Sequence, residues 1–207
     1  CDPSSYNELQ FSTPVNVGAF AAALGVRDIT TASAEQPVAR KRAVPATALD
    51  DTRAPGLEDA GYDRQPPART FAYRLAPTLR SADGQTLGYP FIGIVENWHE
   101  RAFTSFGDGH GVWEPGGGMQ LPFYARNFRD VRQWLTRITP ADLMPRILTL
   151  EKAFFHDVPP GAGTARRLNV TPDATQSFGI NLQPVLPNGV GLVWAGVRPG
   201  TPIDRSE

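Results

Sequence analysis

The sequence predicts an all-β protein made of two β-sandwich modules, each with a short helix. Three observations support this prediction. The chain has 207 residues, which suits two small domains, since domains commonly run about 100 to 150 residues. Its 20 glycines and 20 prolines separate short apolar runs instead of gathering in one tail, as is typical of turn-rich β proteins. Strand-like apolar segments occur on both sides of a glycine-rich stretch.

The bulk composition argues against several kinds of partner. With 20 basic and 21 acidic residues the formal net charge is −1, so no global field attracts nucleic acid or an anionic membrane, and we expect no nucleic-acid partner. No apolar run approaches the about 20 residues that span a bilayer. Cys1 is the single cysteine, which excludes an internal disulfide and a zinc site built from cysteines.

The first half predicts four strands and one helix. The helix covers residues 15–24, with Asn16 as its N-cap and Gly25 in the C-cap position. The strands are expected at residues 6–11, 26–31, 70–79 and 85–94. A tight turn at residues 81–84 precedes the last of them, because aspartate and glycine accept the backbone angles of a sharp reversal.

A long loop interrupts the first half at residues 32–67. The segment is rich in alanine, proline and charge and has no clear periodicity, so we interpret it as an excursion over the surface. It contains a basic triplet, Arg40, Lys41 and Arg42. Such a triplet can bind nucleic acid or be a processing site, but most are solvated loop.

The second half predicts five strands and a second helix. The strands are expected at residues 121–128, 131–138, 166–170, 177–184 and 189–197. The last is the most continuously apolar and is expected to be central, whereas neither face of 131–138 is cleanly apolar, so both faces should be partly covered. The helix follows Thr139 as N-cap, with Leu143, Ile147 and Leu150 as its apolar stripe.

Residues 91–121 join the two halves and hold the candidate chemistry. His99, Glu100, His110 and Glu114 are weak candidates for a metal site, because imidazoles and carboxylates are metal ligands. The sequence after His99 lacks the second histidine that would place two imidazoles on one helix face, and the glycines around Asp108 oppose a helix. We therefore expect no metal and no cofactor, and assign no catalytic residue.

The same stretch is expected to act as a connector between the modules. Its glycines allow the backbone to turn from one sandwich to the next. Its aromatic residues Trp98, Phe106 and Trp113 are expected to pack at the seam between the modules, because aromatic side chains commonly fill cores and domain seams.

Cys1 allows two interpretations. A cysteine followed by Asp2 is what a bacterial lipoprotein shows after signal cleavage, with a lipid on the thiol. A fragment that begins at a cysteine by chance would look the same, and we favour the fragment, because a strand-like run begins by Tyr6 and leaves almost no tether.

Two pairs of segments resemble one protein family. FSTPVNVGAFAAALGV and TFAYRLAPTLRSADGQTLGYPF resemble a strand-helix signature and a closing hairpin of bacterial Ig-like modules. The run GVWEPGGG followed by LPFYARN, and SFGINLQPVLPNGVGLVWAGVRPG, resemble the entry into a macroglobulin domain and its later strands. Modules of both kinds occur near the N-terminus of bacterial alpha-2-macroglobulin-like proteins. The first strand expected ahead of FSTPV is largely absent, which favours a fragment.

The resemblance implies three parts and a role. They are an Ig-like module at residues 1–100, a glycine-rich connector at 101–120 and a macroglobulin-like β-sandwich at 121–207. It implies a scaffold within a broad-range peptidase inhibitor of the bacterial cell envelope, periplasmic or extracellular, which traps proteases after they cut a bait region. Its partners would be other modules of the same long chain and, through the whole protein, target proteases. The Cys-x-x-Gln thioester motif of that family is missing.

One alternative from another class stays open. A secreted carbohydrate-binding or carbohydrate-active β-sandwich protein could use residues 91–121 as its site. Glu96, Glu100 and Glu114 are the carboxylates that a glycosidase would need there.

Overall fold

The structure is a computed structural model of the chain, and it describes residues 1–203 except 4, 6, 32, 49, 108–111, 113–117 and 155. The chain forms two compact units, Cys1–Glu100 and Arg101–Glu207. Both are built mainly from antiparallel strands, so the predicted all-β class is confirmed. No described helix is long and apolar enough to cross a membrane.

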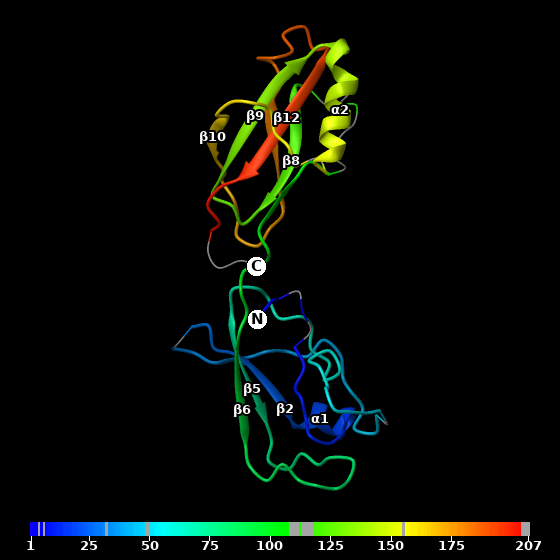
Figure 1. Ribbon diagram of the computed structural model, residues 1–207. Helices are drawn as coiled ribbons and strands as arrows, with labels where there is room; N and C mark the ends of the chain where they lie inside the picture. The colour runs from blue at the N-terminus through cyan, green and yellow to red at the C-terminus, as the bar shows by residue number, and fades with distance from the viewer. Residues whose placement is uncertain are drawn as a thin grey trace. The chain divides into compact units, whose positions relative to one another are not determined.

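The first unit is built on a four-stranded antiparallel sheet in the order β3-β2-β5-β6 (Figure 1). Its strands are β2 (Leu24–Asp28), β3 (Gln36–Pro37), β5 (Thr70–Leu75) and β6 (Phe91–Glu96). A second layer consists of helix α1 (Val17–Ala23) and the pair β1 (Val15–Asn16) and β4 (Asp51–Thr52). β5 is central because it pairs with β2 on one side and β6 on the other.

Helix α1 begins as predicted but ends differently. The Oδ1 atom of Asn16 accepts hydrogen bonds from the backbone of Gly18 at 3.0 Å and Ala19 at 3.2 Å, which confirms it as the N-cap. Gly25 is not a C-cap, because Leu24 is already extended and the chain enters β2 directly. The Arg40 guanidinium donates to the carbonyls of Ala21 and Leu24, the latter at 2.8 Å. Arg40 thus supplies hydrogen bonds to carbonyl groups at the C-terminal end of α1, as a glycine cap would have done through the backbone.

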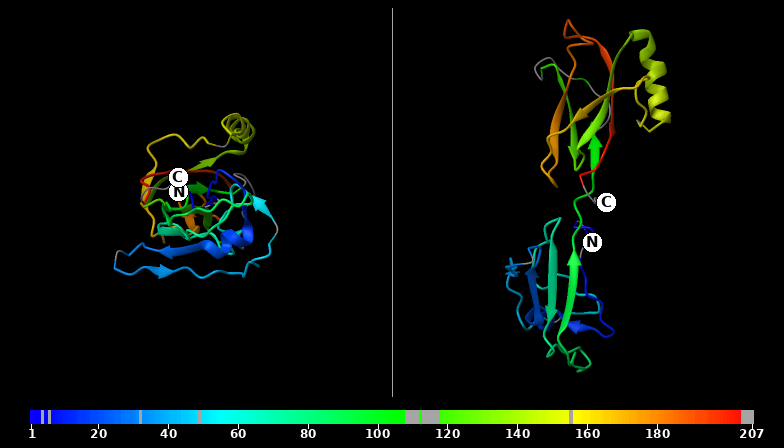
Figure 2. Two further views of the ribbon diagram at one scale, coloured as in Figure 1. Left: turned by 90° about the horizontal axis from the view of Figure 1, so that it is seen from below. Right: turned by 90° about the vertical axis from the view of Figure 1, so that its left-hand side faces the viewer.

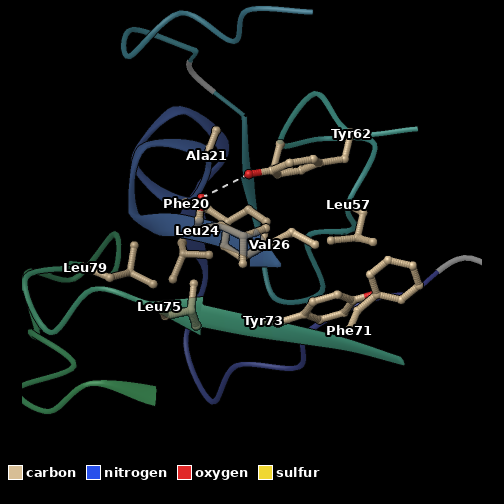
Figure 3. Close-up of a cluster of buried hydrophobic side chains, with 12 residues drawn as sticks. Phe20, Ala21, Leu24, Val26, Leu57, Tyr62, Phe71, Tyr73, Leu75 and Leu79 are labelled. Carbon is tan, nitrogen blue, oxygen red and sulfur yellow. Dashed lines mark hydrogen bonds between the residues drawn. The ribbon is translucent and has the colours of Figure 1, made fainter. Parts of the chain in front are cut away.

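The core of the first unit includes part of the loop that the sequence placed on the surface. Leu57, Ala60 and Tyr62 belong to the same buried cluster as Phe20 of α1 and Phe71 of β5. Figure 3 shows Leu57 and Tyr62 in this cluster. The surface interpretation of residues 32–67 is therefore wrong in its second half. Periodicity could not reveal these residues, because single apolar side chains from an irregular segment fill gaps over the sheet.

The first predicted strand is also wrong as a regular element. Residues 7–11 run beside residues 53–56, with Leu9 donating to Pro55 at 3.1 Å and Phe11 to Arg53 at 2.8 Å. Only an isolated bridge, between Glu8 and Gly56, links them in strand fashion. The backbone N–H and C=O groups of these two irregular segments therefore bond each other without forming a regular β-ladder.

The second unit is a sandwich of two three-stranded antiparallel sheets, β11-β8-β7 and β10-β9-β12 (Figures 1 and 2). The first sheet consists of β7 (Phe103–Ser105), β8 (Gln120–Arg126) and β11 (Gln176–Asn181), and the second of β9 (Asp130–Ile138), β10 (Thr164–Arg167) and β12 (Leu192–Pro199). Phe123, Ala125, Val131, Leu168 and Ile180 form the buried core between them.

The predicted connector and the first strand of this unit overlap. β7 lies within residues 101–120, yet it pairs with β8 in the register Phe103↔Arg126 to Ser105↔Tyr124. These three residues therefore belong to a sheet, and any turning point lies outside them. The sequence did not show a strand here because FTS is too short for alternation to be read.

β9 is the central strand of its sheet, which corrects the expectation for residues 189–197. It is nine residues long and pairs with β10 and β12 on its two sides. Both of its faces are covered, as predicted: Val131 lies in the core, and on the other face Trp134 is 8% exposed and donates its indole N–H to the Gly161 carbonyl at 2.8 Å.

Helix α2 (Leu143–Lys152) follows a 3-10 turn at Pro140–Asp142 and lies outside the sandwich (Figure 2). Thr139 occupies the N-cap position of the 3-10 turn, but its hydroxyl bonds the Asp142 carboxylate at 2.6 Å instead of a backbone amide. The N-cap position of α2 itself is Asp142. The Arg146 guanidinium lies 4.1 Å from the centre of the Trp194 ring, and a cation over an indole ring stabilises this kind of contact.

Candidate functional site

The described part of the stretch from 91 to 121 lies partly in β6 and partly in the second unit. Trp98, His99 and Glu100 follow β6 after Asn97 and are half-buried. The Trp98 amide donates to the Cys1 carbonyl at 2.8 Å, and its carbonyl accepts from Ala68 at 3.0 Å. This segment is therefore tied to the first unit through its backbone.

The structure describes two of the four candidate metal ligands. His99 and Glu100 are sequence neighbours at the end of the first unit. His110 and Glu114, together with Asp108, lie outside the described residues. Among the residues that are described, no group of three or more histidine, cysteine, aspartate or glutamate side chains is arranged to hold a metal ion.

Calorimetry tests the expectation that this stretch holds no metal. We expect titration of Zn²⁺ or Ca²⁺ into the chain to give the same heat as titration into the variant with alanine at His99, Glu100, His110 and Glu114, because the sequence lacks a spacing that would converge these side chains. A saturable heat in the parent chain that the fourfold variant loses would contradict this expectation.

The predicted seam residues have different environments. Trp98 is half-buried in the first unit, and Trp113 lies outside the described residues. Phe106 follows β7 and packs on the core of the second unit, with its ring centre 6.2 Å from that of Phe123. Packing between the units stays a prediction.

Asn97 is a buried polar residue beside this stretch that the sequence did not single out. It is 3% exposed, and its side-chain amide donates to the carbonyls of Gln65 at 3.2 Å and Pro66 at 3.1 Å. These bonds tie the end of β6 to the segment that leads into β5. We assign Asn97 a structural role, because both hydrogen-bond partners of its side chain are backbone carbonyls.

Each member of the basic triplet has a defined contact. Arg40 lies 5.2 Å over the Tyr62 ring in addition to its bonds to α1. Lys41 forms an exposed ion pair with Asp63 at 3.0 Å, and Arg42 donates to the Glu58 carbonyl at 2.9 Å. All three residues are exposed, as expected for a solvated loop. Arg40 nevertheless fastens the loop to α1, whereas the contacts of Lys41 and Arg42 join two parts of the loop itself.

Two surface hollows carry no evident catalytic constellation. One of about 430 Å³ is lined by Arg42, Asp50 and Asp59 among smaller residues. The other, of about 520 Å³, is lined by Arg129 and Arg167. Neither is lined by a histidine or a cysteine, so neither contains a Ser–His or Cys–His pair.

Tyr73 is a buried titratable side chain in the first core. It is 2% exposed, and Asn7 donates its side-chain amide to the phenolic oxygen at 3.1 Å. Burial raises the pKa of Tyr73 to about 12, from an ordinary value of 10.0, because the phenolate would lose its hydration. The folded chain therefore keeps this proton at a pH at which the unfolded chain loses it.

This shift predicts a loss of stability at alkaline pH. The contribution of the neutral hydroxyl is fully present below pH 10.0 and is lost as the pH rises towards about 12. We expect the free energy of unfolding to fall by up to roughly 2 to 3 kcal/mol over this range because of Tyr73 alone. Denaturant unfolding at several pH values measures it, with Tyr73→Phe as the control that lacks the ionisable group. The same slope in both proteins would refute the assignment.

Comparison with known proteins gives a fold but no family. No family model matches the chain, and no curated protein matches it. Among solved structures, the chain is similar to Salmonella alpha-2-macroglobulin reacted with methylamine, with a TM-score of 0.59 and 15% identity over 93% of this chain. The fold is macroglobulin-like. The chain spans only 12% of that protein's length.

Two further similar structures are of Escherichia coli alpha-2-macroglobulin. The native conformation from single-particle microscopy has a TM-score of 0.43 and 13% identity, covering 99% of this chain and 13% of that one. The crystal structure that spans domains MG0-NIE-MG1 has a TM-score of 0.44 and 12% identity, covering 95% of this chain and 66% of that one.

Proposed function

We propose that this chain is a structural scaffold within a longer, alpha-2-macroglobulin-like broad-range peptidase inhibitor and that it carries no chemistry of its own. The observation that carries the proposal is the likeness to the Salmonella protein, which extends over both units at 93% of this chain while using 12% of that chain. Two units matched together in one structure support a shared modular order more strongly than one common sandwich would.

The proposal assigns partners and a place in the cell. The partners are other modules of the same long chain and, through the whole protein, target proteases. The whole protein would work in the periplasm or outside the cell, associated with the envelope. A lipid anchor on Cys1 would require Cys1 to be the first residue of the mature protein, and it is the less favoured alternative to a chain that continues ahead of Cys1; the thiol is exposed and free.

Two experiments test the function. The complete gene product should exceed a thousand residues, and a stop codon directly after Glu207 would contradict the proposal. The purified whole protein, incubated with trypsin, should block cleavage of a large protein substrate while leaving cleavage of a small peptide substrate intact, because a trapped protease keeps its active site. Equal cleavage of the large substrate with and without the protein would also contradict it.

We further propose that Trp98 and Trp113 pack at the seam between the units, with Phe106 beside them. Trp98→Ala should then lower the free energy of unfolding by roughly 3 to 5 kcal/mol, as for other buried aromatic residues. It should also split one calorimetric unfolding transition into two. Phe106 is a poor probe because it already packs on Phe123. A change within about 0.5 kcal/mol, the usual range at the surface, would refute packing by Trp98.

A further inference from the structure

β6 has an open edge in the part of the chain that the structure describes. It is the last strand of the order β3-β2-β5-β6 and pairs with β5 alone (Figure 1). Asn97, the next residue after β6, donates its amide to Arg69 on the β5 side at 2.8 Å. Because backbone groups alternate along a strand, the N–H and C=O groups of Ile92, Ile94 and Glu96 face away from β5.

The backbone of Cys1 already occupies the end of this edge. Its amino group donates to the carbonyl of Glu96, and its carbonyl accepts from the amide of Trp98 at 2.8 Å. Two bonds that flank one residue of the neighbouring strand, here Asn97, are the pattern of a parallel pair. Cys1 therefore runs in the same direction as β6, and a backbone that continued ahead of it in that direction would lie along Glu96, Ile94 and Ile92.

We propose that the residues immediately ahead of Cys1 in the longer protein form a strand parallel to β6. This inference rests on the proposed function, which places the chain inside a longer polypeptide. About six residues suffice to reach Ile92, since both strands rise by about 3.3 Å per residue. Their backbone carbonyls would accept hydrogen bonds from the outward-facing amides of Ile92, Ile94 and Glu96, and the sheet would then have five strands.

The side chains of this edge support such a neighbour. Ile92 is 57% exposed and Ile94 is 61% exposed, on the same face of β6. The unpaired backbone groups of an open edge strand are a template for pairing with another strand, and an edge strand that also exposes apolar side chains is one that proteins normally cover or interrupt. A parallel strand would place its own alternate side chains beside these two isoleucines.

Amide hydrogen exchange with residue-level mass spectrometry tests the proposal. In the chain that begins at Cys1, the amides of Ile92, Ile94 and Glu96 should exchange quickly, whereas Gly93 and Val95, which face β5, should be protected. In the whole protein the three edge amides should exchange at least about tenfold more slowly. Gly93 and Val95 serve as internal controls and should be protected in both proteins.

Ile94→Pro provides the matched variant. Proline lacks the N–H that points to the open edge, so the pairing of β6 with β5 should survive, and Gly93 and Val95 should stay protected. In the whole protein the variant should bring Ile92 and Glu96 back towards the fast exchange of the shorter chain.

The outcomes separate this inference from the proposed function. Equal exchange of the edge amides in both proteins, or a long mature protein whose first residue is Cys1, would overturn the added strand while the scaffold role stands. A gene product that stops directly after Glu207 would contradict the scaffold role, whatever the exchange rates are.

Discussion

Phe123→Ala is expected to lower the free energy of unfolding of the second unit by about 3 to 5 kcal/mol. The Phe123 side chain is fully buried and lies between the two sheets, with its ring 5.6 Å from that of Phe178. Removing it takes away apolar contacts with both sheets and leaves a cavity that fixed strands cannot close.

The adjacent residue provides the control for this substitution. Tyr124 lies on the same strand but points to the opposite face and is 44% exposed. Tyr124→Ala should change the free energy of unfolding by no more than about 0.5 kcal/mol, the usual range for surface positions. Urea titration followed by circular dichroism measures both variants. Equal effects would show that the core of the second unit does not lie between its sheets.

Gly61→Ala is expected to destabilise the first unit by about 2 to 5 kcal/mol, because a left-handed backbone angle and a steric overlap act together. Gly61 has a φ of 84°. A methyl group there would overlap the carbonyl oxygen of Arg42, and Gly61 accepts hydrogen bonds at its own carbonyl from Lys41 at 2.8 Å and Arg42 at 3.3 Å. The loop cannot move away without losing those bonds.

Gly84→Ala separates the cost of the left-handed backbone angle from the cost of the steric overlap. Gly84 has nearly the same φ, 86°, but no atom lies within 4 Å of the added methyl group. It should therefore show the backbone cost alone, roughly 1 to 2 kcal/mol. Thermal unfolding of both variants measures the difference. If Gly84→Ala costs as much as Gly61→Ala, the overlap with the Arg42 carbonyl adds nothing to the backbone cost, and the steric part of the prediction is wrong.

The sequence predicted the all-β class and most of the strands, because local patterns determine them. Alternation located β5, a β-suited run of residues located β9, and the side-chain chemistry of Asn16 fixed the start of α1. It also predicted that both faces of residues 131–138 are covered, since apolar and polar side chains share each face. These features depend on neighbours within a few residues.

The candidate site was less predictable, since its residues depend on long-range contacts. Spacing alone argued against a metal site at His99 and Glu100, but no local pattern indicates that Cys1 pairs beside β6, 95 residues away. Likewise, Asn97 is recognisable as a structural residue only through its bonds to Gln65 and Pro66.

The sequence by itself determined that this protein is made of short strands with turns between them and has no evident catalytic motif. Only the tertiary structure decided which strand is central, that Leu57, Ala60 and Tyr62 belong to the core, and that Arg40 closes α1. The physical reason is that the order of strands in a sheet and the filling of a core depend on contacts between residues far apart in the sequence. Such contacts produce no periodic pattern that can be recognised in the sequence.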